Sequence, residues 1–213
     1  MNKTVKMLFL AGAAFVLGYN YSYAKEIWKM TFDDCKEGEI APGFVASSGQ
    51  WIVVKEKTPS GKMNGYLFQG QSDSRNNPVV TFAKGGDLKD VSMQVRFRVE
   101  KKGSNQTIGI ILKHRGESDY LSLVLSISEG SMRLIRTEQG KTSVLAKAAV
   151  SMGANTWHRL QLFTKDDRLS CSLNNQKIIQ AKDKALDAKG KIGLATYGDT
   201  IAAFDNMSLV KLD

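Results

Sequence analysis

Hydrophobic and polar residues alternate along several short segments of the chain. In residues 91–100, VSMQVRFRVE, every second residue from Val91 is hydrophobic, and the residues between them are polar. Because successive side chains of a strand point to opposite faces, this pattern predicts a β-strand with one buried and one polar face. Alternation or a short apolar run predicts further strands in IWKMTF, WIVVKE, PVVTFA, QTIGIILKH, DYLSLVLSI, SMRLIRT and KIGLATY.

Polar turn signals such as Glu129-Gly130 and Gln139-Gly140 separate these segments. Short strands at this spacing favour a β-sandwich or a β-barrel. The best helix candidate, about Gln180–Ala188, is short and has no amphipathic stripe. No internal repeat, linker or low-complexity tract divides the chain. The sequence therefore predicts one all-β domain.

Residues 155–180, NTWHRLQLFTKDDRLSCSLNNQKIIQ, contain one of the two histidines of the chain. Alternation places His158 on the apolar face of a strand, and Trp157 and Arg159 on the other face. The pair Asn174-Asn175 tolerates the positive φ of a tight turn, so the segment predicts a three-stranded meander. A histidine on an apolar face is more often a hydrogen-bonded structural residue than a catalyst, and His158 is interpreted in that way.

The first 24 residues have the features of a secretory signal peptide. Two lysines precede the apolar run Met7–Gly18, and Ser22-Tyr23-Ala24 ends in small residues. The run is shorter than the ~20 residues that cross a bilayer. We expect cleavage after Ala24, which leaves the domain Lys25–Asp213 in the periplasm or outside the cell, with no membrane span. Loss of the two lysines lowers the formal net charge from +9 to +7.

The chain has two cysteines, Cys35 and Cys171. In an oxidising compartment they would be able to pair, and the alternative is that both are small buried hydrophobic residues. Two cysteines and two histidines argue against a zinc site, and no haem-attachment motif is present.

A series of short motifs resembles the concanavalin A-like lectin/glucanase superfamily. The nearest group is that of exported bacterial 3-keto-disaccharide hydrolase-like domains, or laminin-G-like jelly rolls. The resemblance implies an all-β jelly-roll sandwich of two antiparallel sheets over residues 25–213, with a concave front face and a carbohydrate ligand. It does not fix an activity. The motifs are Phe32-Asp33-Asp34, Pro42-Gly43-Phe44, Trp51, Asn155–Leu160, Asn174-Asn175, Gly190–Leu194 and Phe204-Asp205-Asn206.

The catalytic motif of laminarinase-like members of this superfamily is incomplete. These members carry E-x-D-x-E on one strand, whereas the nearest match, Glu117–Leu121, ends in leucine. Retaining glycoside hydrolysis needs two carboxyl groups on either side of the scissile bond. The segment is interpreted as a polar loop, and no catalytic residue is assigned.

The resemblance also implies a structural calcium ion between the first loop and the last strand. Asp33, Asp34 and Asp205 are the candidate oxygen ligands. The alternative is that Asp205 and Asn206 bind the backbone of the strand. Phe204 and, less firmly, Trp157 are expected to serve the fold rather than a ligand.

Polar residues of the predicted strands form a candidate ligand surface. Tyrosine can stack on a sugar ring, and guanidinium groups bind carboxylate or sulfate. The positive charge favours an anionic saccharide, and a merely solvating basic face is the alternative. The residues expected to converge on the front sheet are Arg96, Arg98, Lys113, Arg115 and Tyr120, with Gln94, His114 and Arg133 or Arg136 nearby.

Three functions remain open. The first is a lectin-like module that binds a saccharide or glycoconjugate without catalysis. The second is a hydrolase that acts on a disaccharide or a modified glycoside. The third is a structural component that contacts an envelope protein. Nucleic acid is not expected as a partner, because export removes it and no basic–aromatic stacking motif is present.

Overall fold

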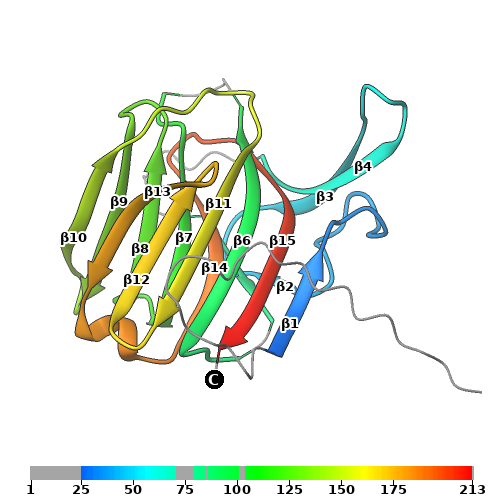
Figure 1. Cartoon of the computed structure of the whole chain (residues 1–213). Coiled ribbons are helices and arrows are strands. Elements are labelled where there is room, and N and C mark those ends of the chain that lie inside the picture. Colours follow the sequence, from blue (N-terminus) through cyan, green and yellow to red (C-terminus); the bar gives the residue numbers. More distant parts are fainter. Residues whose placement is uncertain (1–24, 71–78, 85, 101–103, 213) are drawn as a thin grey trace, which may run out of the picture.

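Two antiparallel β-sheets pack face to face in the structure, a computed structural model that describes residues 25–70, 79–84, 86–100 and 104–212 (Figure 1). This arrangement confirms the all-β sandwich that alternation and the motifs predict. The expected signal peptide, residues 1–24, lies outside the described residues. None of the helical segments in the described part of the chain is long and apolar enough to cross a membrane.

The first sheet has eight strands. Their spatial order is β13-β12-β11-β6-β15-β4-β3, and β1 also pairs with β15. The strands of this sheet are β1 (Lys25–Met30), β3 (Trp51–Lys57), β4 (Met63–Gln69), β6 (Asp90–Val99), β11 (His158–Lys165), β12 (Arg168–Leu173), β13 (Gln176–Lys182) and β15 (Ala202–Leu212).

The second sheet has seven strands in the order β10-β9-β8-β7-β14-β5-β2. A 3-10 turn, η1 (Lys184–Asp187), lies between β13 of the first sheet and β14 of the second. The strands of the second sheet are β2 (Phe44–Ala46), β5 (Val79–Ala83), β7 (Thr107–Gly116), β8 (Asp119–Ser126), β9 (Ser131–Glu138), β10 (Lys141–Ala149) and β14 (Lys191–Tyr197).

The core lies between the two sheets and is filled by every second residue of their strands. On β6 the buried residues Val91 to Val99 alternate with half-buried polar residues, as the sequence predicts. Phe97 and Phe204 from the first sheet are less than 2% exposed, and so are Leu121 and Leu123 from the second. The position of Phe204 agrees with its expected role in the fold.

The strands that the sequence predicts are present, and the structure adds three more. The sequence did not predict β2, β4 or β10. The segment Gln180–Ala188, the best helix candidate of the sequence, contains the end of β13 and the η1 turn, which agrees with the prediction of one all-β domain. The meander was correct: β11, β12 and β13 pair in sequence, and Asn174 and Asn175 both have positive φ in the turn.

Both cysteines are free. Cys171 lies in the core, where burial raises the pKa of its thiol to about 12. Cys35 packs at the edge of the same core, and burial also raises the pKa of its thiol. The structure thus shows the second of the two alternatives, in which the cysteines act as small hydrophobic residues.

The loop after β1 packs closely on β4 at Gly65. The backbone N–H of Gly65 donates to the carboxylate of Asp33 at 2.9 Å. A Cβ atom at position 65 would lie 2.3 Å from the carbonyl oxygen of Phe32, which is backbone and cannot rotate away. The aromatic residue of the Phe32-Asp33-Asp34 motif is therefore held in the core by contact with a glycine.

The exchange Gly65→Ala is expected to lower the free energy of unfolding by about 1–3 kcal/mol, because the new methyl group overpacks this contact. Gly116→Ala is the matched control, since a Cβ there meets nothing within 4 Å. Chemical denaturation of both variants measures the difference. Equal stability of the two variants would show that the Phe32 loop does not sit on β4.

Candidate functional site

The five residues expected to share one site lie on two different sheets. Arg96 and Arg98 belong to β6 of the eight-stranded sheet, and Lys113, Arg115 and Tyr120 belong to β7 and β8 of the seven-stranded sheet. Their neighbours in each strand fill the core, so the two arginines and Tyr120 face outward on opposite sides of the sandwich. The prediction of one shared surface was therefore wrong.

Tyr120 belongs to a group of aromatic side chains on the outer surface of the seven-stranded sheet. We call this group, Phe82, His114, Tyr120 and Tyr197, the aromatic face. The ring centroid of His114 lies 4.5 Å from that of Phe82 and 6.0 Å from that of Tyr120. Phe82, Tyr120 and Tyr197 also pack on a small apolar cluster of Val80, Ile111 and Ala195.

Two glycines allow rings of the aromatic face to lie over neighbouring strands. A Cβ atom at Gly109 of β7 would come within 2.9 Å of the ring of Tyr197, which projects from β14. A Cβ atom at Gly193 of β14 would come within 2.9 Å of the ring of Phe82, which projects from β5. Each of these two rings therefore packs against a neighbouring strand at a position where only glycine leaves room for it.

Polar groups border these rings. The pKa of His114 is lowered mainly by burial and, to a smaller extent, by the nearby ammonium group of Lys191. Its imidazole is therefore neutral at pH 7. The Lys191 ammonium lies 5.9 Å from the centre of the Phe82 ring. Burial raises the pKa of Tyr197 to about 12, and its hydroxyl interacts with Ser122. Neutral donors and acceptors and one cation thus surround an apolar floor.

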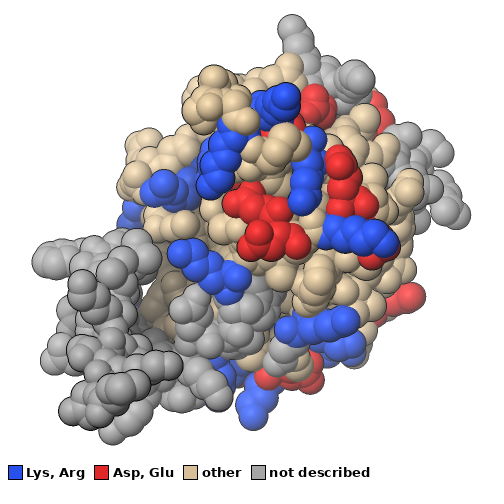
Figure 2. All heavy atoms as spheres, turned by 90° about the vertical axis from the view of Figure 1, so that its right-hand side faces the viewer, with Lys and Arg blue, Asp and Glu red and all other residues tan. Residues whose placement is uncertain are grey.

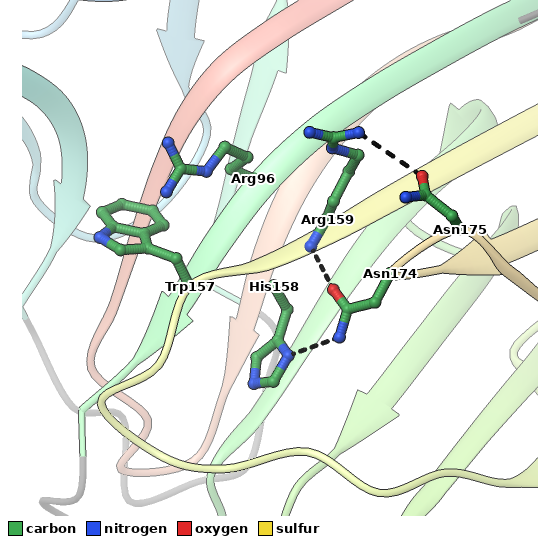
Figure 3. A pocket seen from close by; sticks show the side chains of 6 residues that line it. All are labelled: Arg96, Trp157, His158, Arg159, Asn174 and Asn175. Atoms are coloured by element: carbon green, nitrogen blue, oxygen red, sulfur yellow. Dashed lines mark hydrogen bonds between the residues drawn. The ribbon is translucent and has the colours of Figure 1, made fainter. Parts of the chain in front are cut away.

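The eight-stranded sheet carries a groove of about 300 Å³ on its outer surface. We call it the arginine groove, and Figure 3 shows its lining residues. They come from β6, from β11 and the residue before it, and from the β12–β13 turn: Arg96, Trp157, His158, Arg159, Asn174 and Asn175.

Trp157 lies on this outer surface and not in the core, contrary to its expected role. The guanidinium carbons of Arg96 and Arg98 lie 5.0 and 4.8 Å from the centre of its ring. Arg98 also forms a bidentate pair with the carboxylate of Glu56, at 3.1 and 3.2 Å. Tyr66 completes this cluster, with its ring edge-on to Trp157.

His158 is a structural residue, as the sequence predicts. It is 6% exposed, and its ring packs on Phe97. Its Nε2 lies 2.9 Å from the carbonyl oxygen of Gly153, which accepts only, so Nε2 carries the proton. Its Nδ1 then accepts from the amide nitrogen of Asn174 at 3.1 Å. Both ring nitrogens are engaged, and neither is available for catalysis.

The residues proposed for calcium do not form a metal site. The carboxylate of Asp33 accepts a hydrogen bond from the backbone N–H of Gly65. The carboxylate of Asp205 accepts from the backbone and side chain of Asn206, as in the alternative to calcium binding that the sequence offers. Burial raises the pKa of Asp205, which disfavours the charged form that binds a cation. Asp34 is exposed. Among the described residues, no three acidic, histidine or cysteine side chains gather where they could hold a metal.

Arg115 and Lys113 have other roles. The guanidinium of Arg115 pairs with Asp119 at 2.7 Å across the β7–β8 turn, so Glu117–Leu121 forms a tight polar turn and the start of β8. Lys113 lies in the irregular part of β7, is 3% exposed, and donates to the carbonyl oxygen of Lys89. Its ammonium group therefore points into the protein.

Basic and acidic side chains are mixed on the side of the molecule that Figure 2 shows. Figure 2 shows the side of the molecule that lies at the right in Figure 1, where acidic groups lie among basic ones. Pairs such as Lys36–Glu39 and Arg98–Glu56 neutralise part of this charge. On this side of the described structure the basic residues do not form a uniform cationic surface.

Sequence reasoning missed Phe82, Tyr197 and Arg159. A usable signal for the two aromatic residues was the presence of Gly109 and Gly193 inside strands, since a glycine there often marks close approach of another group. Arg159 had no such signal, because its importance depends on which strand lies beside β11.

Comparison with known proteins supports the fold. Residues 27–210 match the family described as 3-keto-alpha-glucoside-1,2-lyase-like domain. No curated protein matches the chain.

Solved structures with the same fold have low sequence identity. A carbohydrate-binding module, CBM66, from Bacillus subtilis is 17% identical, with a TM-score of 0.62 over 78% of this chain and 93% of that chain. A legume lectin-like domain from Entamoeba histolytica is 11% identical, with a TM-score of 0.60 over 80% and 91%. A Bacillus subtilis protein with a galectin-like fold is 12% identical, with a TM-score of 0.59 over 90% and 100%. These similarities show a lectin-like jelly-roll fold.

The buried Lys113 is expected to make stability depend on pH. Burial lowers the pKa of this lysine from 10.5 to about 8, so the unfolded chain binds more protons between these values and the fold gains stability as pH rises. Lys113→Met removes this gain of ~2–3 kcal/mol and stabilises the protein at pH 7.

Denaturation at pH 7, 8, 9 and 10 measures both effects, and the same exchange at the exposed Lys147 is the control. A Lys113→Met variant whose stability follows the pH dependence of the wild type would contradict the assignment.

Proposed function

Because the chain belongs to the family of 3-keto-alpha-glucoside-1,2-lyase-like domains, we propose that it binds a saccharide on its aromatic face. The observation that carries the proposal is the placement of the Tyr197 and Phe82 rings over Gly109 and Gly193. Rings that lie over backbone offer a flat apolar surface, and the C–H groups on one side of a sugar ring pack on such a surface.

The border of the aromatic face suits the hydroxyl groups of a sugar. The neutral imidazole of His114 offers one donor and one acceptor, and the Lys191 ammonium offers donors. An apolar floor with a few polar groups around it is the usual composition of a site for small molecules. The positive charge of Lys191 also allows an acidic sugar to bind, although the apolar floor does not require a negative charge on the ligand.

Proteins of similar fold support this choice of ligand class. The Bacillus subtilis structure is described as a carbohydrate-binding module, and the Entamoeba histolytica structure as a legume lectin-like domain. Export, directed by residues 1–24, is part of the proposal, because it places the protein in contact with extracellular or periplasmic glycans.

The aromatic face predicts the effect of Tyr120→Ala on binding. A glycan array identifies the best saccharide, and calorimetric titration then measures its affinity. Loss of the Tyr120 ring is expected to weaken binding at least tenfold at every salt concentration, because stacking does not depend on a screened charge. Phe163→Ala, an aromatic truncation on the outer surface of the opposite sheet, is the control and should leave the affinity unchanged.

Unchanged affinity of Tyr120→Ala would contradict the proposed location. If the array shows no bound saccharide at all, the alternative of an envelope protein partner replaces saccharide binding.

His114 favours a second candidate function, cleavage of a glycoside at the same face. The name of the family refers to a 1,2-lyase acting on a 3-keto-glucoside. A ketone at C3 acidifies the proton at C2, and a neutral imidazole can remove it. The C1–O bond then breaks, a C1=C2 double bond forms, and the departing oxygen keeps the bond electrons and takes up a proton.

Mass spectrometry of a 3-keto-glucoside incubated with the protein tests this candidate. Release of the aglycone by the wild type and its loss in His114→Gln, with saccharide binding retained, is the expected result for catalysis. If the wild type binds the 3-keto-glucoside but releases no aglycone, the result contradicts cleavage and supports a lectin-like module.

A further inference from the structure

We propose that the arginine groove is a second ligand site, which binds an oxyanion: the carboxylate or sulfate group of an acidic saccharide. The groove lies on the eight-stranded sheet, on the opposite side of the sandwich from the aromatic face. The proposal does not depend on saccharide binding at the aromatic face.

Two arginines face each other across the groove. Arg96 of β6 and Arg159 of β11 are direct partners in neighbouring antiparallel strands. Both side chains point to the outer surface and line the same groove (Figure 3). Like charges directly opposite each other on a sheet are destabilising. An anion between or beside the two guanidinium groups would convert this repulsion into attraction.

The protein neutralises the charges of Arg96 and Arg159 incompletely. The nearest carboxylate to Arg96 is that of Asp205, at 3.9 Å, and burial shifts this carboxyl toward its neutral form. Within the described parts of the chain, no carboxylate lies within ion-pair distance of Arg159. Arg98 differs, because the carboxylate of Glu56 holds it in a bidentate pair.

Hydrogen bonds hold the lining of the groove in place. The side-chain oxygen of Asn174 accepts from the backbone N–H of Arg159 at 2.9 Å, and its amide nitrogen donates to His158. The side-chain oxygen of Asn175 accepts from the guanidinium of Arg159 at 3.5 Å. The turn therefore fixes the strand that carries Arg159, as Figure 3 shows.

The chemistry of the lining residues selects the ligand. A guanidinium group presents parallel N–H donors that match the oxygens of a carboxylate or sulfate. The indole of Trp157 forms one wall and can contact the carbon skeleton that bears the anion. About 300 Å³ is at the lower end of the range for small-molecule sites. These features fit the acidic substituent and one sugar ring better than a larger ligand.

Thermal unfolding in the presence of chosen anions tests the site. Sodium sulfate, sodium glucuronate and neutral glucose are added to the full chain at constant ionic strength, with chloride as the balancing ion. A ligand that binds only the folded state raises the melting temperature with a saturable dependence on concentration. Sulfate and glucuronate are expected to do so for the wild type, and glucose is not.

Arg159→Gln is the decisive variant. It should weaken the response to both anions at least tenfold, and in chloride alone it should melt at a slightly higher temperature, because the like-charge pair is gone. Arg168→Gln, the same exchange on the neighbouring strand β12, is the matched control and should respond like the wild type.

The relative affinity of the two anions identifies the source of the oxyanion. Tighter binding of glucuronate than of sulfate supports a site for an acidic sugar, in which Trp157 contacts the ring. Equal binding of both supports a site for the oxyanion alone. An equal response of wild type and Arg159→Gln, or no response of the wild type to either anion, would overturn the proposal.

Discussion

The whole structure depends on burial of the inner faces of two sheets against each other. Phe97 and Phe204 from one sheet and Leu123 and Leu194 from the other are almost completely buried in the core that they share. Burial of such side chains is the main favourable term in folding. Because side chains alternate along a strand, the residues between them must point outward. Any ligand site of this sandwich is therefore built on an outer face, on an edge or in a turn.

The two outer faces are chemically different. That of the seven-stranded sheet carries aromatic rings that lie over glycines, which gives an apolar floor with polar groups around it. That of the eight-stranded sheet carries arginines and their carboxylate partners. The first is suited to the C–H surface of a sugar, and the second to an acidic substituent. The two proposed sites would therefore lie on opposite outer faces of the same sandwich.

Alternation in the sequence was sufficient to predict most strands and the outward direction of Arg96 and Arg98. It could not show that β6 and β7, although consecutive, belong to different sheets, because alternation distinguishes inside from outside but not one sheet from the other. The sequence did not predict the edge strand β10, because most of its residues are exposed and its hydrophobic and polar residues do not alternate clearly. The arginine groove was missed for a related reason, since the partnership of Arg96 and Arg159 is a property of strand pairing.

Binding of a saccharide on the aromatic face is best examined by NMR titration of the isotope-labelled protein with its best-bound neutral saccharide. We expect the largest chemical-shift changes at Phe82, Tyr120 and Tyr197 and in the strands β5, β7, β8 and β14 that carry and flank them. Changes confined to the eight-stranded sheet around Arg159, with none on the aromatic face, would contradict this expectation.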